Sequence, residues 1–341
     1  MRDNKKTRLF ALAAAAFVLV VMSTGVCGEE MSLWPMIEPF HSGYLKLSDI
    51  HEMYYETSGN PEGTPVFVLH GGPGGSSSPY MRRFCDPDEF LIVLYDQRGA
   101  GQSKPQAELR ENTTQHLVQD IEQLRNHLHL GKIIIFGGSW GTTLGLAYAE
   151  AYPENVSGIV LRGVFTATQE EIDHFYHDGA NRCFPDAYDK LLAVLPDPLR
   201  RPLPDYLFEL IQNGSDAERD RYCKAWATYE TKMAVLEISD EWIDEHYDKN
   251  SPYVFALFEN YYMTNHCFLE EGQLLGNTDK IKHIPTIIVN GRYDMICPSI
   301  TAYRLHQKMP KSKLIIAEGA GHWMGDKPVE AALLQAFKEF E

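Results

Sequence analysis

Positive charge is scarce in this sequence. The 341 residues include 31 lysines and arginines against 47 aspartates and glutamates, which gives a formal net charge of -16. A nucleic-acid partner is not expected, because phosphate binding needs a basic face and no basic cluster stands out. The acidic surface is consistent with solubility, and acidic groups near a pocket would also attract a cationic substrate.

Closely spaced cysteine pairs are also missing. None of the six cysteines has the C-x-x-C spacing; they are Cys27, Cys85, Cys183, Cys223, Cys267 and Cys297. This pattern argues against a disulfide framework and against a zinc site. We expect mostly buried free thiols, with at most one or two bridges, and we expect neither a metal nor a cofactor.

The N-terminus has the composition of an export signal. Four basic residues among the first eight precede an uncharged apolar run over residues 9–22. The run is shorter than the ~20 residues that span a bilayer, and the small residue Gly28 suits a cleavage site. We therefore predict a signal peptide over residues 1–28 and a secreted or exported protein without stable membrane association. An uncleaved signal that anchors the protein in the membrane is the alternative.

Short apolar runs, each followed by a glycine, predict buried strands. The runs are PVFVLHGG, FLIVLYDQRG, KIIIFGG, VSGIVLRG, TIIVNG and KLIIAEG. Helical patterns lie between several of them, as in the segment with Leu117, Ile121, Leu124 and Leu128 at helical spacing. Continuous apolar strands that alternate with helices are typical of a parallel sheet covered on both faces. The expected fold class is therefore α/β, with a mostly parallel, doubly wound sheet.

This alternation breaks over residues 165–270. Several helical patterns follow one another there, and no strand-like run separates them. An insertion of about 100 residues is too long for a loop, so we predict an all-helical cap domain. The two parts of the α/β core then cover residues 34–164 and 271–341. Ligands bind at the carboxyl edge of such a sheet, and we expect the cap to lie over that edge.

The pentapeptide GGSWG, residues 137–141, places Ser139 between an apolar strand and a helical pattern. A nucleophile elbow needs this context, because its serine occupies a tight strand-to-helix turn and flanking glycines avoid steric clashes. No lysine follows the glycines, which excludes a phosphate-binding P-loop. The pattern is short, and a glycine-rich turn that merely contains a serine is the alternative. The strand and the helix around it favour Ser139 as a nucleophile.

A serine nucleophile needs a base, and the base needs an orienting carboxylate. In folds with a nucleophile elbow the chain order is serine, acid, histidine. Asp294 follows one predicted strand and His322 follows the next, so both are expected at the edge where Ser139 lies. Other histidines compete for the role but follow no predicted strand; they include His266, His283 and His306. We predict Ser139, Asp294 and His322 as the catalytic residues.

Serine attack on a carbonyl also needs donors for the oxyanion that forms. The glycine-rich sequence HGGPGG, residues 70–75, follows a strand well before the elbow, where the second donor usually lies. The backbone N–H groups of Gly72 and Trp140 are the candidate donors. A glycine turn needed only for close packing is the alternative.

Taken together, these motifs resemble those of one family. HGGPGG, YDQRGAGQS, GGSWG, LRGVF, GRYDMICP and GAGH are similar, in order and spacing, to the prolyl aminopeptidase (proline iminopeptidase) branch of the α/β-hydrolases from about residue 34 onward. The resemblance implies release of N-terminal proline from short peptides through an acyl-enzyme intermediate, with the same three catalytic residues. An esterase or amidase of this fold, acting on another small acyl group, is the alternative. Members of the family are usually intracellular, whereas this chain begins with an apparent export signal.

The resemblance also assigns substrate-binding residues. An aminopeptidase must hold a protonated amine at a fixed distance from the scissile carbonyl, and in the family two cap helices supply carboxylates for this. The matching positions are Glu230 and Glu259, each set among aromatic residues. Without the resemblance, each would be interpreted as a solvated helix residue. Arg162 and Phe165 match the family's pocket motif, and Phe165 is expected to form part of an apolar wall for the pyrrolidine ring.

Overall fold

The computed structural model describes residues 32–341. The predicted signal peptide, residues 1–28, lies outside the described residues, and so does Cys27. Among the helices of the described chain, none is both long enough and apolar enough to cross a membrane. The five cysteines within residues 32–341 are free thiols, four of them buried and Cys183 exposed. The expectation of mostly buried free thiols is therefore confirmed for these five.

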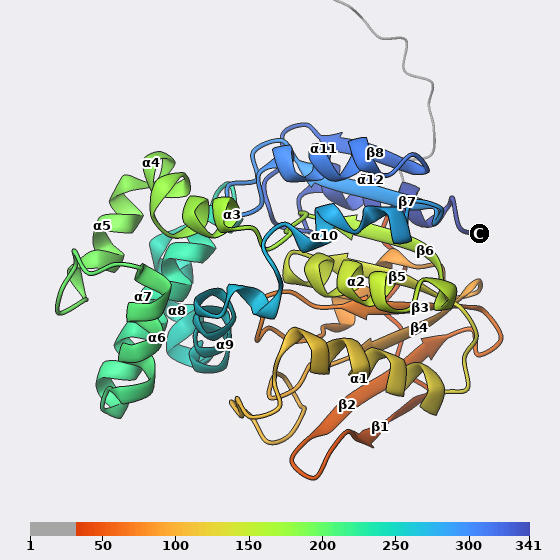
Figure 1. Ribbon diagram of the computed structural model, residues 1–341, viewed down its shortest axis with the longest axis horizontal. Helices are drawn as coiled ribbons and strands as arrows, with labels where there is room; N and C mark the ends of the chain where they lie inside the picture. Colours follow the sequence, from red (N-terminus) through yellow and green to blue (C-terminus); the bar gives the residue numbers. More distant parts are fainter. Residues whose placement is uncertain (1–31) are drawn as a thin grey trace, which may run out of the picture. The chain divides into compact units, whose positions relative to one another are not determined.

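An eight-stranded sheet forms the core, in the order β1-β2-β4-β3-β5-β6-β7-β8 (Figure 1). The strands are β1 (His41–Lys46), β2 (Glu52–Gly59), β3 (Thr64–Leu69), β4 (Phe90–Tyr95), β5 (Ile133–Gly138), β6 (Val156–Arg162), β7 (Thr286–Gly291) and β8 (Ser312–Ala317). Strands β3 to β8 are parallel, whereas β2 pairs antiparallel with β1 and with β4. The predicted α/β fold class, with a mostly parallel sheet, is confirmed. The six apolar runs are β3 to β8, and the largely exposed β1 and the mixed polar β2 were not predicted.

Helices cover both faces of this sheet. They are α1 (Thr114–His127), α2 (Trp140–Ala151), α11 (Ser299–Lys308) and α12 (Lys327–Phe337). Side chains alternate between the two faces of a strand. Phe67 of β3 therefore packs in a buried cluster with α1 and α2, whereas its neighbour Val66 packs in a second cluster with α12. Both faces are buried, which explains why the strands are continuous apolar runs.

Between β6 and β7 the chain forms only helices and loops, and Figure 1 shows α4 to α9 gathered beside the sheet. The elements are α3 (Gln169–Asp173), η3 (His174–Asp178), α4 (Ala180–Cys183), α5 (Pro185–Ala193), α6 (Leu203–Asn213), α7 (Asp216–Ala234), α8 (Asp240–Lys249), α9 (Tyr253–Thr264), η4 (His266–Phe268), α10 (Gln273–Gly276) and η5 (Thr278–Lys280). The segment from α3 to η4 is called the cap below.

The cap contacts loops that follow the carboxyl ends of two core strands. After β8, the backbone N–H of Trp323 donates to the carbonyl of Ala234 at the end of α7, over 3.0 Å. After β3, a Cβ atom placed on Gly74 would come within 2.8 Å of the carbonyl oxygen of Val254 in α9. The cap is therefore in close contact with the edge of the sheet where ligands bind in open α/β folds.

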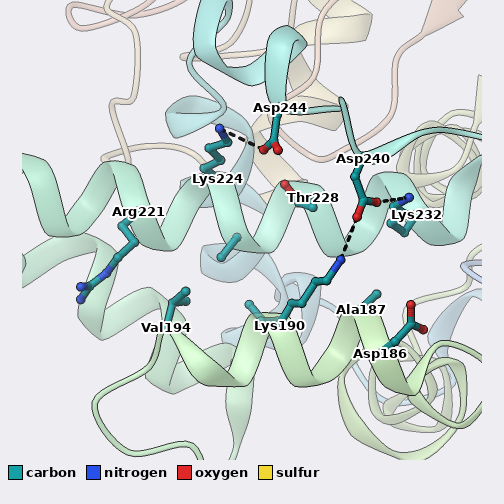
Figure 2. Close-up of a pocket in the computed structure, with 12 residues that line it drawn as sticks. Asp186, Ala187, Lys190, Val194, Arg221, Lys224, Thr228, Lys232, Asp240 and Asp244 are labelled. Carbon is teal, nitrogen blue, oxygen red and sulfur yellow. Dashed lines mark hydrogen bonds and ion pairs between the residues drawn. The ribbon is translucent and has the colours of Figure 1, made fainter. Parts of the chain in front are cut away.

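A groove on the cap lies between α5 and the α7–α8 pair (Figure 2). It encloses about 290 Å³, and paired charges lie along it. Lys190 binds Asp240 at 2.8 Å, and Lys224 binds Asp244 at 3.2 Å. These pairs are largely exposed and each contributes little to stability. None of the predicted site residues lines this groove.

Candidate active site

Ser139 occupies the turn between β5 and α2. Its backbone angles are φ 57° and ψ -127°, in the positive-φ region that is strained for residues other than glycine. The neighbouring glycines are required by close packing, because a Cβ atom on Gly141 would collide with the carbonyl oxygen of Leu69. The N–H of Ser139 donates to the carbonyl of Arg162 over 2.9 Å. The serine is thus presented on a tight turn that neighbouring backbone holds in place.

Asp294 and His322 form a buried pair in the loops after β7 and β8. Nδ1 of His322 donates to Oδ2 of Asp294 over 2.8 Å. The other carboxylate oxygen, Oδ1, accepts hydrogen bonds from the backbone N–H groups of Ile296 at 3.0 Å and Cys297 at 2.7 Å. With its proton on Nδ1, the neutral imidazole keeps the lone pair of Nε2 for another partner.

Arg162 contacts His322 and also the backbone next to Ser139. Its Nη1 donates to the backbone carbonyl of His322 over 2.9 Å and to Nε2 of the same residue over 3.1 Å. Within residues 32–341, no hydrogen bond joins Ser139 directly to His322. The hydroxyl of Ser139 instead lies within hydrogen-bonding reach of the Cys297 thiol. The structure thus brings Asp294 and His322 into contact, whereas Nε2 of His322 is bonded to Arg162 and not to Ser139.

The HGGPGG loop passes beside Ser139. A Cβ atom on Gly71 would lie 3.2 Å from Cβ of Ser139, and the N–H of Gly75 closes the loop on the carbonyl of Gly71 over 3.2 Å. Gly72 has φ 111°, a conformation that glycine adopts without strain. Trp140 is the first residue of α2, so the helix itself supplies no acceptor for its backbone N–H. Both candidate oxyanion donors therefore lie in segments that adjoin Ser139.

Glu230 of α7 and Glu259 of α9 form a carboxyl pair inside the cap. The two side chains are close enough for the charge of Glu230 to act on Glu259. Oε2 of Glu230 is buried and has no hydrogen-bond partner in the described part of the chain. Burial raises the pKa of Glu230 to about 7. Burial also raises the pKa of Glu259 well above its usual range, and the charge of Glu230 adds to that effect.

Aromatic side chains surround the carboxyl pair. The indole N–H of Trp226 donates to Oε2 of Glu259 over 2.5 Å. Tyr176 stacks on Trp226 with ring centroids 4.5 Å apart, and Phe175 meets Trp226 edge to face at 5.2 Å. Phe165, the predicted wall of the pocket, is buried after the end of β6. The carboxyl pair is thus enclosed by apolar surface, which explains the raised pKa values.

Comparison with known proteins agrees with this geometry. The family described as alpha/beta hydrolase fold matches residues 64–327. A probable proline iminopeptidase from Leptolyngbya boryana is 44% identical over 309 residues, which cover 90% of this chain and 96% of the relative. The proline iminopeptidase of Arabidopsis thaliana is also 44% identical, over 90% of this chain and 82% of the relative. The chain belongs to the proline iminopeptidase family of the α/β-hydrolases.

Solved structures with low sequence identity share the fold of this proline iminopeptidase family member. An esterase from Exiguobacterium antarcticum has a TM-score of 0.61 at 19% identity, over 88% of this chain and 99% of that structure. A proline iminopeptidase-related protein from Thermus thermophilus has a TM-score of 0.58 at 19% identity, over 88% of this chain and 96% of that structure. At this identity the two structures speak for the fold alone. The assignment of the protein as a hydrolase rests on the family match and on the curated relatives.

A cleft of about 520 Å³ opens between the HGGPGG loop and the start of α9. It is lined by neutral polar and aromatic groups, among them Ser76 and Asn250. Tyr247, which also lines it, lies close to the carboxyl pair: burial raises the pKa of Tyr247 to about 12, and the charges of Glu230 and Glu259 contribute. In this family member the cleft therefore borders the HGGPGG loop, and one of its lining residues, Tyr247, senses the charges of the carboxyl pair.

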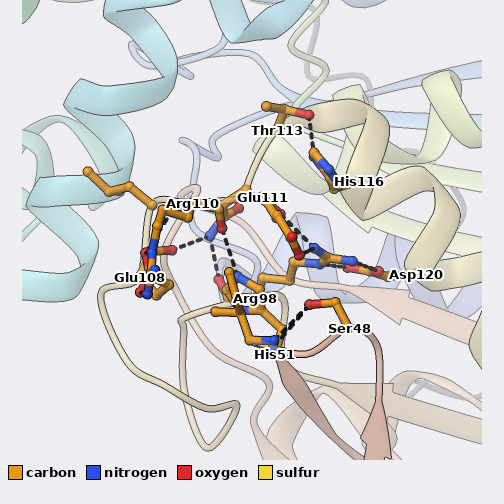
Figure 3. A network of polar contacts seen from close by, with 12 residues as sticks. Ser48, His51, Arg98, Glu108, Arg110, Glu111, Thr113, His116 and Asp120 are labelled. Carbon is orange, nitrogen blue, oxygen red and sulfur yellow. Dashed lines mark hydrogen bonds and ion pairs between the residues drawn. The ribbon is translucent and has the colours of Figure 1, made fainter.

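The DQRG turn after β4 is braced by buried polar contacts (Figure 3). Asp120 of α1 binds the guanidinium of Arg98 through both of its oxygens, each at 2.7 Å. Asp96 accepts hydrogen bonds from the backbone N–H groups of Ser77 at 2.7 Å and Gln102 at 2.8 Å. Charge-assisted bidentate contacts of this kind fix both position and orientation. The turn is a rigid support behind the HGGPGG loop, which leads on to Ser77.

Sequence patterns missed two residues that lie close to Ser139 or its neighbours. The thiol of Cys297 is near the serine hydroxyl, and Gln97 makes hydrogen bonds to both the HGGPGG loop and Trp140. Both residues lie inside motifs that carry the family resemblance, YDQRGAGQS and GRYDMICP, and this location was the sequence signal that could have pointed to them. Of the competing histidines, His306 is engaged with Ser312 at 2.7 Å.

Proposed function

We infer that this protein is a serine aminopeptidase that releases N-terminal proline from peptides. The observation that carries the inference is the carboxyl pair, in which Oε2 of Glu230 is buried beside Glu259 without a partner in the described chain. A buried acceptor without a partner is costly, and a cationic hydrogen-bond donor removes that cost. The protonated amine at a peptide N-terminus is such a donor.

The surroundings of the carboxyl pair favour proline as the first residue. A protonated proline amine has two N–H bonds, one for each carboxyl group, and its ring is apolar. We place the ring against Phe165 and Phe175, which are both buried. Phe165 follows the end of β6, and Phe175 packs on Trp226, whose indole binds Glu259. An aromatic wall excludes water and discriminates against polar side chains at this position. Arg162 was also predicted to bind substrate, and its contacts with His322 favour a different role that is tested below.

Ser139 is the proposed nucleophile. Its oxygen attacks the carbonyl carbon of the proline residue, and its proton passes to Nε2 of His322, whose Nδ1–H stays bonded to Asp294. For this transfer the serine hydroxyl takes the position at Nε2 that Arg162 occupies in the free protein. The imidazolium then gives the proton to the nitrogen of the departing peptide, the C–N bond breaks, and a prolyl ester remains on Ser139. A water molecule that gives its proton to His322 hydrolyses this ester and frees proline.

The backbone N–H groups of Gly72 and Trp140 are the proposed donors to the oxyanion. Two donors fixed in advance stabilise the charge that develops on the carbonyl oxygen, and loss of one costs roughly 3–4 kcal/mol of barrier. The rest of the peptide is proposed to extend into the cleft beside the HGGPGG loop, where Ser76 and Asn250 offer neutral hydrogen-bonding groups.

Amine recognition is tested with matched naphthylamides. Prolyl-naphthylamide should be hydrolysed, and N-acetylprolyl-naphthylamide, which lacks the charged amine, should not. The double variant Glu230→Gln/Glu259→Gln should lose at least about a hundredfold in kcat/KM for the free-amine substrate, as expected when buried charge pairing is lost. The exposed Glu241→Gln is the control. If the blocked substrate is turned over as fast as the free one, the protein is an esterase or amidase for neutral acyl groups.

The identity of the nucleophile is tested separately with a fluorophosphonate probe. Mass spectrometry should find the adduct on Ser139, and the variant Ser139→Ala should remain unlabelled and inactive. A folded, labelled Ser139→Ala protein would contradict the assignment of the nucleophile.

We further propose that residues 1–28 direct export and are removed, so that the enzyme acts on peptides outside the cytoplasm without a stable membrane anchor. The basic start and the short apolar run support this proposal. N-terminal sequencing of the exported protein should begin at Glu29. An intact N-terminus in the membrane fraction would show instead an uncleaved anchor.

A further inference from the structure

Gln97 stands in the centre of the DQRG turn and is buried, with 3% of its surface exposed. Its two neighbours are fixed, Asp96 by the backbone of Ser77 and Arg98 by Asp120. The side chain of Gln97 therefore starts from an immobile backbone. In a buried site of this kind, each polar atom needs a defined partner.

Every polar group of the Gln97 side chain has such a partner. Its amide Nε2 donates to the backbone carbonyl of His70 over 2.9 Å, and its Oε1 accepts from the indole Nε1–H of Trp140 over 2.9 Å. The backbone N–H of Gln97 donates to Nε2 of His70 over 3.0 Å. This bond puts the proton of the neutral His70 ring on Nδ1, which donates to the carbonyl of Gly71 over 3.0 Å. One residue thus contacts both segments that adjoin Ser139.

These two segments are the ones that carry the candidate oxyanion donors. His70 and Gly71 lead directly into Gly72, and Trp140 directly follows Ser139. Stabilisation of an oxyanion requires both N–H groups to lie about 3 Å from one point in space, and displacement of either loses most of the effect. The two segments follow the neighbouring strands β3 and β5, whose pairing ends at Leu69 and Gly137. Beyond that point, the contacts of Gln97 join the two segments.

We propose that Gln97 is a positioning residue that holds the backbone N–H groups of Gly72 and Trp140 in register for the oxyanion, an inference that rests on the proposed serine hydrolase chemistry. An amide is the side chain that fits this task, because it offers a donor to His70 and an acceptor to Trp140 at the same time. Glutamate would lose the donor, and methionine would lose both. Because Gln97 is buried behind the two donor segments, its replacement should weaken stabilisation of the transition state and leave substrate binding nearly unchanged.

The test is a double-mutant cycle with Gln97→Met and Trp140→Phe, measured on prolyl-naphthylamide. Trp140→Phe keeps the backbone N–H and removes the indole donor. Gln97→Met should lower kcat by about ten- to a hundredfold and change KM by less than about twofold, because only transition-state binding is lost. The double variant should lose no more than Gln97→Met alone. The exposed Gln123→Met is the matched control and should leave both constants unchanged.

Two results would overturn the proposal: losses in kcat that multiply in the double variant, or a raised KM with an unchanged kcat. Binding of a prolyl boronic acid, which forms a tetrahedral adduct with the serine, gives a second readout and should weaken in parallel with kcat/KM. If Gln97→Met does not fold, Trp140→Phe alone should still lower kcat about tenfold at constant KM. An unchanged kcat in Trp140→Phe would reject the positioning role of Gln97.

A wrong proposal for the enzyme's function can be distinguished from a wrong proposal for the positioning role of Gln97. If the wild type does not cleave prolyl-naphthylamide, the rate of phosphonylation of Ser139 by a fluorophosphonate replaces kcat as the readout, because that reaction also develops charge on an oxygen next to the serine. Gln97→Met should slow phosphonylation as well. Equal rates in variant and wild type would reject the role of Gln97 whatever the natural substrate is.

Discussion

Arg162 holds His322 at two points, the ring Nε2 at 3.1 Å and the backbone carbonyl at 2.9 Å. The guanidinium is buried, and a Cβ atom on Gly138 would lie 2.5 Å from its Nη2. It therefore touches the backbone next to Ser139 as well as the histidine. Contacts of this kind favour a role in orienting the base over direct contact with substrate.

Arg162→Met should therefore lower kcat for prolyl-naphthylamide by about tenfold or more while KM changes by less than about twofold. The physical reason is that the loop of His322 loses the hydrogen bond to its backbone carbonyl, whereas the contact at Nε2 is given up in any case when Ser139 takes that position. Steady-state kinetics at several substrate concentrations separate the two constants. The exposed Arg200→Met serves as the control. A large rise in KM with little change in kcat would instead assign Arg162 to substrate binding.

Asp294→Asn should reduce kcat by about 10⁴ and leave the fold intact. The carboxylate accepts the proton of His322 Nδ1 at 2.8 Å, and an amide that presents its N–H there would favour the wrong tautomer. Nε2 would then carry the proton and could not accept one from Ser139. Activity and thermal unfolding are measured together, with the exposed Asp279→Asn as control. Near-normal turnover in a folded Asp294→Asn protein would exclude this acid.

Glu230→Gln should stabilise the free protein at alkaline pH. Burial raises the pKa of Glu230 from the ordinary 4.5 to about 7. Between these values the folded state binds more protons than the unfolded state, so the free energy of unfolding falls as pH rises from about 4.5 to 7. The variant lacks this loss and should gain on the order of 1–3 kcal/mol at pH 8 relative to the wild type. The gain should vanish at pH 4 to 5 in urea unfolding; a gain that is equal at both pH values would contradict the buried titration.

Ser76→Trp should discriminate between substrates of different length. Ser76 is exposed in the cleft beside the HGGPGG loop, and an indole there would fill part of its volume. The ratio of kcat/KM for the peptide Pro-Gly-Gly-Gly to that for prolinamide should fall about tenfold, because only the longer substrate reaches the cleft. The exposed Ser157→Trp, at the start of β6, is the control. An unchanged ratio would place the departing peptide elsewhere.

Much of the fold could be predicted because its signals are local. Strands β3 to β7 are largely buried on both faces, so each is a continuous apolar run that ends at a turn. The last strand, β8, is also apolar, although it is partly exposed. The positions of Asp294 and His322 followed from topology, since parallel strands bring their carboxyl ends to one edge. The outermost strand β1 is mostly exposed and gives no such run, which is why it was not predicted. Helix α8 is likewise rich in charge and buries only Ile243, so it has no apolar face that a sequence pattern could reveal.

The contacts within the site could not be predicted in the same way. The hydrogen bonds of Arg162 to His322 depend on how the end of β6 meets the loop after β8, segments 160 residues apart. The unpartnered oxygen of Glu230 depends on the packing of α7 against α9. A contact between two segments that are far apart in the sequence leaves no periodic pattern in either of them. The residue types within each motif, by contrast, could be recognised from the sequence.

The cap is inserted between two strands that are neighbours in the sheet. Arg162 at the end of β6 pairs in register with Val289 of β7. The chain thus leaves and re-enters the sheet at adjacent places, and the cost of closing an inserted loop grows only slowly with its length. Selection can therefore exchange or reshape this segment as a cassette, while the strand order that supports Ser139, Asp294 and His322 stays the same. Glu230 and Glu259 lie within this segment and Ser139, Asp294 and His322 lie outside it, so the two groups of residues are encoded on separate parts of the gene.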